Sequence, residues 1–234
     1  MSGTYSGCYN LTGNPVCGWI VNTMNSTYAS CNKLTGSPVC GEHVVDMIYT
    51  YSNCYNLTGN PVCGQFVRNM QYAYRNCVNL TGNPVGSNAV WNMSGTYHNC
   101  YRLTGSPVCG ESVSDLSYTY WNCQNLTGNP VCCDRVYNMA NTYYNCYKLT
   151  GNPVCGLNVT NMSYTYYNCT NLTGEAACGD KVSDMSYTYY NCTNLNKAAC
   201  GDSVFNLIYT YTNCHNLQGE AACGSKVRNM NNTY

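Results

Sequence analysis

Residues 31–53 read CNKLTGSPVCGEHVVDMIYTYSN, and variants of this 23-residue unit fill the whole chain of 234 residues. The cysteine that opens the unit recurs every 23 residues, except that the last interval is 22. These inner cysteines are Cys8, Cys31, Cys54, Cys77, Cys100, Cys123, Cys146, Cys169, Cys192 and Cys214. A fixed period of this size is typical of repeat architectures in which each copy stacks on the next. The sequence therefore predicts a solenoid of about ten coils rather than a domain with one central core.

Several positions hardly change between copies when each inner cysteine is counted as position zero. Position 3 is always Leu, position 13 is always Val, position 16 is Met or Leu, and position 20 is always Tyr. A single copy cannot bury these side chains alone, so neighbouring copies must stack to complete a shared core. In the unit quoted above, the expected core residues are Leu34, Cys40, Val44, Met47, Tyr51 and Cys54.

The two halves of each unit favour different local structures. In the segment that ends in Pro-Val-Cys, Gly and Pro lie too close together for a helix, so it is expected to form a loop and a short parallel β-strand. From position 13 onward the apolar residues are spaced by 3, 4 and 3, which is the spacing of one helix face. Because Thr, Tyr and Asn are poor helix formers, we expect only one or two turns of α or 3-10 helix. The predicted fold is thus a leucine-rich-repeat-like solenoid.

The unit resembles the BspA-like (treponemal-type) leucine-rich repeats of bacterial and phage surface proteins. The matching residues in the copy that begins at Cys31 are Cys31, Leu34, Val44, Met47, Thr50, Tyr51 and Cys54. Cys40 stands where the family has a strand aliphatic residue, and Gly41 where it has Pro. The copy departs from the family in having Tyr for Phe, Met for Ile and Thr for Ala. The resemblance covers essentially the whole chain and implies a role in adhesion or host binding.

A second row of cysteines, the outer cysteines, follows the first by nine residues, or eight in the shortened copy: Cys17, Cys40, Cys63, Cys109, Cys132, Cys155, Cys178, Cys200 and Cys223. A disulfide within each copy would require both rows to be lost together, yet Gly86 replaces an outer cysteine while Cys77 remains. Cys133 has no partner that the repeat provides. We therefore expect most thiols to be reduced and buried, with disulfides as the alternative. A metal site is disfavoured, because the chain has no C-x-x-C pair and no row of His.

No arrangement of residues indicates catalysis. The histidines His43, His98 and His215 occupy different positions in the repeat, and the carboxylates are scattered over separate coils as solvated loop charges would be. We expect no enzyme, no cofactor and no metal. The formal net charge is zero and no stretch of about 20 apolar residues occurs, so neither nucleic-acid binding nor membrane insertion is expected.

Polar and aromatic rows indicate where contacts could form. Asn recurs at position 22 and Asn or Asp at position 15, where amides could hydrogen-bond along the solenoid or cap turns. Tyr at position 18 alternates with the core Tyr and should be more exposed, which predicts a binding stripe. Its members are Tyr49, Tyr72, Tyr118, Tyr164, Tyr187 and Tyr209.

Two functions follow from these patterns. The first is a non-catalytic recognition or adhesion module that binds a host protein or a repetitive glycan through one solenoid face. The alternative is a structural protein that self-assembles into fibres, with copies of itself as partners. In either case an extracellular, cell-surface or virion location is expected, although this segment has no signal peptide. The chain begins and ends within a repeat, so residues 1–234 are expected to be one solenoid that belongs to a longer array or has its ends covered by other copies.

Overall fold

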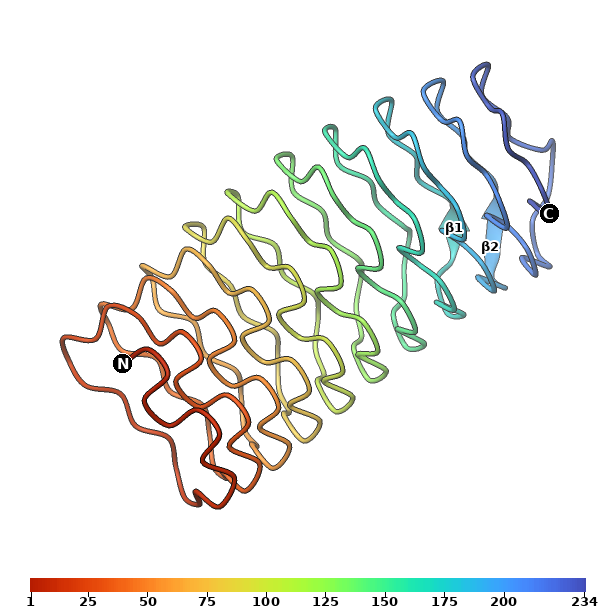
Figure 1. Cartoon of the computed structure of the whole chain (residues 1–234). Coiled ribbons are helices and arrows are strands. Elements are labelled where there is room, and N and C mark those ends of the chain that lie inside the picture. The colour runs from red at the N-terminus through yellow and green to blue at the C-terminus, as the bar shows by residue number, and fades with distance from the viewer.

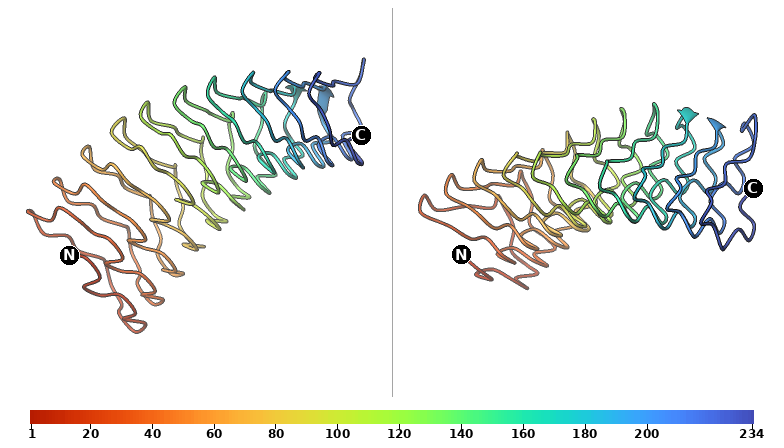
Figure 2. Two further views of the ribbon diagram at one scale, coloured as in Figure 1. Left: turned by 45° about the horizontal axis from the view of Figure 1, so that its top comes forward. Right: turned by 90° about the horizontal axis from the view of Figure 1, so that it is seen from above.

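The computed structural model describes residues 1–234 as one stack of similar coils, with the two termini at opposite ends (Figure 1). The stack bends gently along its length (Figure 2). A single hydrophobic cluster of 45 buried residues runs through it and draws on the same repeat positions in successive coils. The 23-residue period is therefore that of a repeat solenoid.

The coils contain almost no regular secondary structure. The only strands are β1 (Gly174–Glu175) and β2 (Leu195–Lys197), which pair in parallel. Elsewhere isolated parallel bridges connect one residue of each coil with its equivalent in the next, from Thr23 with Asp46 to Asn206 with Asn229. The expected strand at each Pro-Val-Cys segment and the expected helical return in each coil are both wrong.

A ribbon of tight turns takes the place of the predicted helix. Along this ribbon the N–H groups alternate between two kinds of acceptor. The N–H of Met24 donates to the carbonyl of Asp46 in the next coil, and that of Tyr28 to Thr50, over 2.9 Å each. Between them, the N–H of Thr27 donates to the Met24 carbonyl three residues back, also over 2.9 Å. Half of the ribbon's donors thus tie adjacent coils together, and the other half close turns within one coil.

Residues with positive φ prevent this ribbon from continuing as a helix. Two positions in each ribbon are left-handed, for example Tyr49 with φ 53° and Asn53 with φ 63°. Asn tolerates this conformation better than most residues, which explains its recurrence at position 22. Inward-facing residues still recur every three or four positions, because successive three-residue turns produce nearly the same spacing as a helix.

Hydroxyl groups of the core tyrosines explain why the Pro-Val-Cys segments form no strand. The N–H of Val108 donates to the hydroxyl of Tyr120 over 2.9 Å, and this hydroxyl donates to the Val108 carbonyl over 2.9 Å. The same two bonds recur in every coil from Tyr28 to Tyr234. The segment therefore needs no neighbouring strand to satisfy these backbone groups, and Phe could not replace Tyr without leaving them unpaired.

The expected core residues differ in burial. Leu34, Val44, Met47, Tyr51 and Cys54 are all 0 or 1% exposed. Cys40 lies at the rim of the core and is only partly buried, because its segment is not part of a buried strand.

Candidate recognition surface

The six tyrosines of the predicted stripe lie on one side of the solenoid but are not continuous. Tyr49 stacks on Tyr72 with ring centroids 5.1 Å apart. Tyr164, Tyr187 and Tyr209 form a second stack, with centroids 4.6 and 4.8 Å apart. Gly95 and Asn141 occupy the intervening coils, so Tyr118 has no ring neighbour within its own row. Tyr118 is 37% exposed and the other five are half-buried.

A second aromatic row, which sequence reasoning missed, fills the space beside this stripe. It consists of the residues that follow the core tyrosines in five successive coils: His98, Trp121, Tyr144, Tyr167 and Tyr190. Their ring centroids are 5.6, 4.0, 4.5 and 4.8 Å apart in that order. The only signal in the sequence is that the earlier coils carry Ala29, Ser52 and Arg75 at this position, whereas the next five carry rings.

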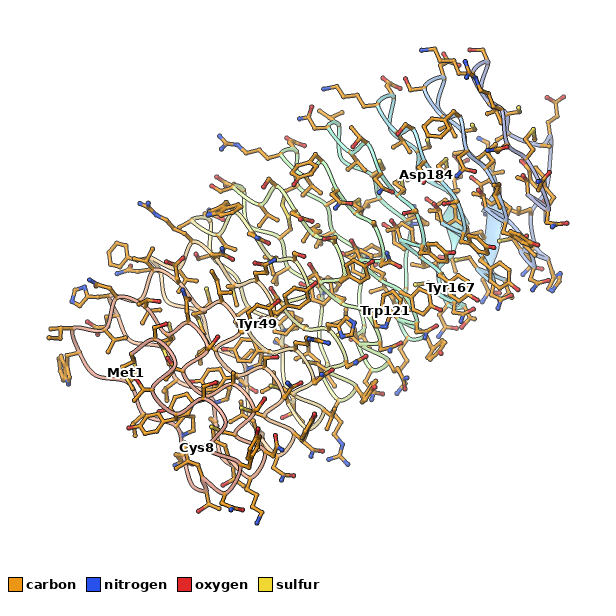
Figure 3. The ribbon with its side chains drawn as sticks, in the orientation of Figure 1. Met1, Cys8, Tyr49, Trp121, Tyr167 and Asp184 are labelled. Carbon is orange, nitrogen blue, oxygen red and sulfur yellow. A yellow bond between two sulfur atoms is a disulfide. The ribbon has the colours of Figure 1, made fainter.

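The two rows touch and form one surface, which we call the aromatic band. Rings of the two rows meet at an angle, as between Tyr164 and Tyr167 (5.9 Å, 40°) and between Tyr187 and Tyr190 (6.0 Å, 42°). Figure 3 shows that Tyr49, Trp121 and Tyr167 follow one another along the solenoid axis. The band consists of His98, Tyr118, Trp121, Tyr144, Tyr164, Tyr167, Tyr187, Tyr190 and Tyr209.

Stacking within each row determines what the band can offer a ligand. Trp121 and Tyr144 are inclined by only 5°, as are Tyr167 and Tyr190, so neighbouring rings cover most of the ring faces in this row. Edges and hydroxyl groups are therefore presented outward. A ring edge carries the positive part of the aromatic quadrupole, so the band favours hydrogen-bond acceptors and the faces of other rings.

The band carries no formal charge near neutral pH. Burial, and in addition the positive charge of Arg75, lower the pKa of His98 to about 4. Partial burial raises the pKa of Tyr164 and of Tyr167, so their hydroxyls remain protonated donors. At the border of the band, the Arg75 guanidinium lies 5.7 Å from the Tyr72 ring centroid, within cation–π range.

A row of asparagine amides lies directly beside the band and stiffens it. The Nδ2 of Asn145 donates to the Oδ1 of Asn122 over 2.7 Å, and Asn168 repeats this contact with Asn145 over 2.8 Å. The row continues from Asn53 to Asn213. The predicted amide ladder at position 22 is therefore present, and the same residues also occupy the left-handed turn positions.

The inner thiols are buried donors rather than nucleophiles. The Sγ of Cys123 donates to the Tyr97 carbonyl over 3.1 Å, and the other buried inner cysteines make the equivalent bond. Burial raises the pKa of Cys54 and of Cys214 to about 12. These thiols are therefore protonated and poorly reactive at neutral pH.

One disulfide corrects the expectation that Cys133 has no partner in the repeat. Cys133 stands where most copies have Gly, and this position faces the outer cysteine of the preceding coil. At the equivalent Gly156, an added Cβ would lie 2.8 Å from the Sγ of Cys132. Cys133 accordingly forms a disulfide with Cys109, with Cα atoms 6.1 Å apart. The remaining 18 cysteines, from the 20 in the chain, are free.

No group of three or more His, Cys, Asp or Glu side chains is arranged to hold a metal ion. No helix in the structure could cross a membrane. The chain matches no family model, no curated protein and no solved structure.

Proposed function

We propose that this solenoid is a non-catalytic recognition or adhesion module that binds its ligand through the aromatic band. The observation that carries the proposal is the band itself, which is continuous along the axis and presents one or two rings in each of six successive coils. Aromatic residues are enriched at recognition surfaces because they combine a large apolar area with a polar edge. The resemblance to BspA-like leucine-rich repeats supports placing the module on a bacterial cell surface or a virion.

The geometry of the band favours a repetitive ligand. Each coil offers a similar small contact, so binding strength grows with the number of coils engaged. Because most ring faces are covered by neighbouring rings, a glycan would be bound mainly by hydrogen bonds to hydroxyls rather than by stacking of its rings. A host protein with a flat, hydrogen-bonding surface would fit the same groups. Association of the band with a second copy of this chain, as in a fibre, is the alternative occupant.

The test removes four rings of the band without straining the backbone. Tyr118, Tyr164, Tyr187 and Tyr209 are replaced together by Asn, which the chain itself carries at the equivalent left-handed Asn141 (φ 60°). The matched control replaces four tyrosines outside the band, Tyr9, Tyr55, Tyr101 and Tyr147, by Asn, which occurs natively at the equivalent Asn32. Both variants lose the same number of rings.

Both variants are compared with the wild type on an array of glycans and on a panel of immobilised host-surface proteins, with circular dichroism as the folding control. At about 1 kcal/mol per ring, the band variant should bind about a thousandfold more weakly, while the control binds like the wild type. Equal binding by the band variant and the wild type would contradict the proposal. Sedimentation of the wild type as large assemblies that the band variant no longer forms would assign the band to self-association instead.

A further inference from the structure

A second surface of the solenoid differs from coil to coil. It consists of the residues at positions 11, 12 and 14 of each copy, which flank the buried valine, and we call it the variable edge. Around Val67 these residues are Gln65, Phe66 and Arg68, whereas around Val113 they are Glu111, Ser112 and Ser114. Flanking segments such as Pro-Val-Cys-Gly barely change. A uniform scaffold that displays different side chains in each coil is the arrangement expected of a specific binding surface.

The backbone of the variable edge is rigid. The N–H of Arg68 donates to the carbonyl of Val45 over 2.8 Å, and that of Trp91 to Arg68 over 2.9 Å. This ladder continues through the same position to Arg228. Side chains at position 14 are therefore held beside one another at the spacing of the coils, which limits the entropy lost when a partner binds.

Exposed apolar side chains concentrate on the variable edge. It carries both phenylalanines and two of the three tryptophans of the chain. Phe66 is 50% exposed, Trp91 48% and Leu157 73%. The other exposed apolar side chains of the edge are Trp19, Ile20, Tyr137 and Phe205. Exposed large apolar residues in such density mark an interaction surface rather than ordinary solvent-facing positions.

A groove of about 350 Å³ crosses the variable edge and has a distinct chemistry. Its lining residues are Asn22, His43, Val45, Phe66, Arg68 and Ala89. No carboxylate lines it, and Arg68 is not in an ion pair, because the only one in the structure joins Lys197 and Glu175. An exposed ring beside an unpaired guanidinium suits an apolar side chain next to a carboxylate.

The charges of the whole edge indicate the class of partner. Five of the ten carboxylates of the chain lie on the edge, at Glu42, Glu111, Asp134, Asp180 and Asp202, together with five of its ten basic residues. A uniformly anionic polymer would be repelled at several coils. An anionic group that is confined to one point of the ligand, as in a peptide, meets Arg68 without this repulsion.

We propose that the groove at Phe66 and Arg68 binds an acidic segment of a protein partner, with an apolar side chain against the Phe66 ring and a carboxylate on the Arg68 guanidinium. The site is separate from the aromatic band. A module with both surfaces could hold a repetitive ligand on the band and a defined protein on the edge.

A library of random 12-residue peptides, displayed on phage and selected on the immobilised full chain, tests this site. Selected peptides should place Asp or Glu beside Leu, Ile, Phe or Trp. Synthetic copies should bind the double variant Phe66→Ser, Arg68→Gln about tenfold more weakly or worse. They should bind the control variant Ser112→Thr, Ser114→Gln, which lies on the same edge, as tightly as the wild type. They should also bind the variant with four band tyrosines replaced as tightly as the wild type. Failure of one proposal therefore leaves the other intact.

Thermal unfolding of each variant checks that the fold is retained, and Arg68→Lys serves as a second variant that keeps the charge. Peptide binding that Arg68→Lys partly preserves and Arg68→Gln abolishes supports a carboxylate contact. Three results would overturn the proposal: no enriched peptides, enriched peptides that lack acidic residues, or peptides that bind the double variant as tightly as the wild type.

Discussion

Tyr164 and Tyr166 lie two residues apart in the same coil, yet their rings occupy different environments. Tyr166 is fully buried, and its hydroxyl donates to the Val154 carbonyl over 2.8 Å and accepts from the Val154 N–H over 3.0 Å. Tyr164 is half-buried in the aromatic band, where its ring stacks on Tyr187 at 4.6 Å. The position of a tyrosine in the turn ribbon, and not its chemistry, therefore decides whether its ring is buried in the coil or lies at the surface.

The core tyrosines form a continuous stack through the solenoid. Their ring centroids are 5.1 to 5.7 Å apart from Tyr5 to Tyr234. Each one from Tyr28 onward also binds, through its hydroxyl, the backbone of the residue twelve positions earlier, as Tyr120 binds Val108. The band has no equivalent tie to the backbone of its own coil. Loss of a core hydroxyl should therefore affect stability, whereas loss of a band hydroxyl should affect binding.

Alkaline pH should destabilise the core, and we expect its effect on the free energy of unfolding to be the largest of those considered. Burial raises the pKa of Cys54 and of Cys214 from 9.0 to about 12, and it also raises the pKa of the core Tyr120. Between pH 9 and 12 the native state retains protons that the unfolded state has released, so stability falls as pH rises. Each such thiol should lower the free energy of unfolding by about 1.4 kcal/mol per pH unit in this range.

Urea unfolding followed by circular dichroism at pH 7, 9, 10 and 11 measures this dependence. We expect the urea midpoint to be similar at pH 7 and pH 9, and to fall at pH 10 and again at pH 11. An unchanged midpoint up to pH 11 would show that the inner thiols are not buried as described.

Replacing Tyr164 by Asn should have the smallest effect on stability. The change removes a half-buried ring, but Asn is better suited than Tyr to φ 56° at this position. These two contributions oppose each other, so the free energy of unfolding should change by less than about 0.5 kcal/mol. Chemical denaturation of the single variant measures the change. A loss above about 2 kcal/mol would mean that the band is part of the structural core. The binding test would then have to replace rings of the second row instead of the four tyrosines at position 18.

Much of the fold could be predicted from the sequence because the positions that stay the same in every copy are the buried ones. Invariant positions such as Leu34, Val44 and Tyr51 are completely or almost completely buried. The local structure could not be predicted in the same way. A spacing of three and four residues arises from a helix and from successive three-residue turns alike, and only the positive φ values at residues such as Tyr49 and Asn53 separate them.

The candidate site was predicted only in part. The stripe at position 18 was visible because Tyr recurs there in most coils. The second row was missed because Trp121, Tyr144, Tyr167 and Tyr190 occupy a position that is not aromatic in the first coils. A pairwise contact between adjacent coils, such as Cys109 with Cys133, also escaped prediction. The two cysteines are 24 residues apart and occupy different positions of the repeat. Their contact depends on how adjacent coils stack, which the 23-residue period does not reveal.

Paired measurements of Tyr166→Phe and Tyr164→Phe test the central claim most directly, because the same atom is removed from two residues of one coil. Denaturant unfolding should show that Tyr166→Phe lowers the free energy of unfolding by about 1 to 3 kcal/mol, since the backbone N–H and carbonyl of Val154 lose their partner. Tyr164→Phe should change it by less than about 0.5 kcal/mol. Equal losses in the two variants would contradict the division of the tyrosines into a structural row in the core and a surface row in the band.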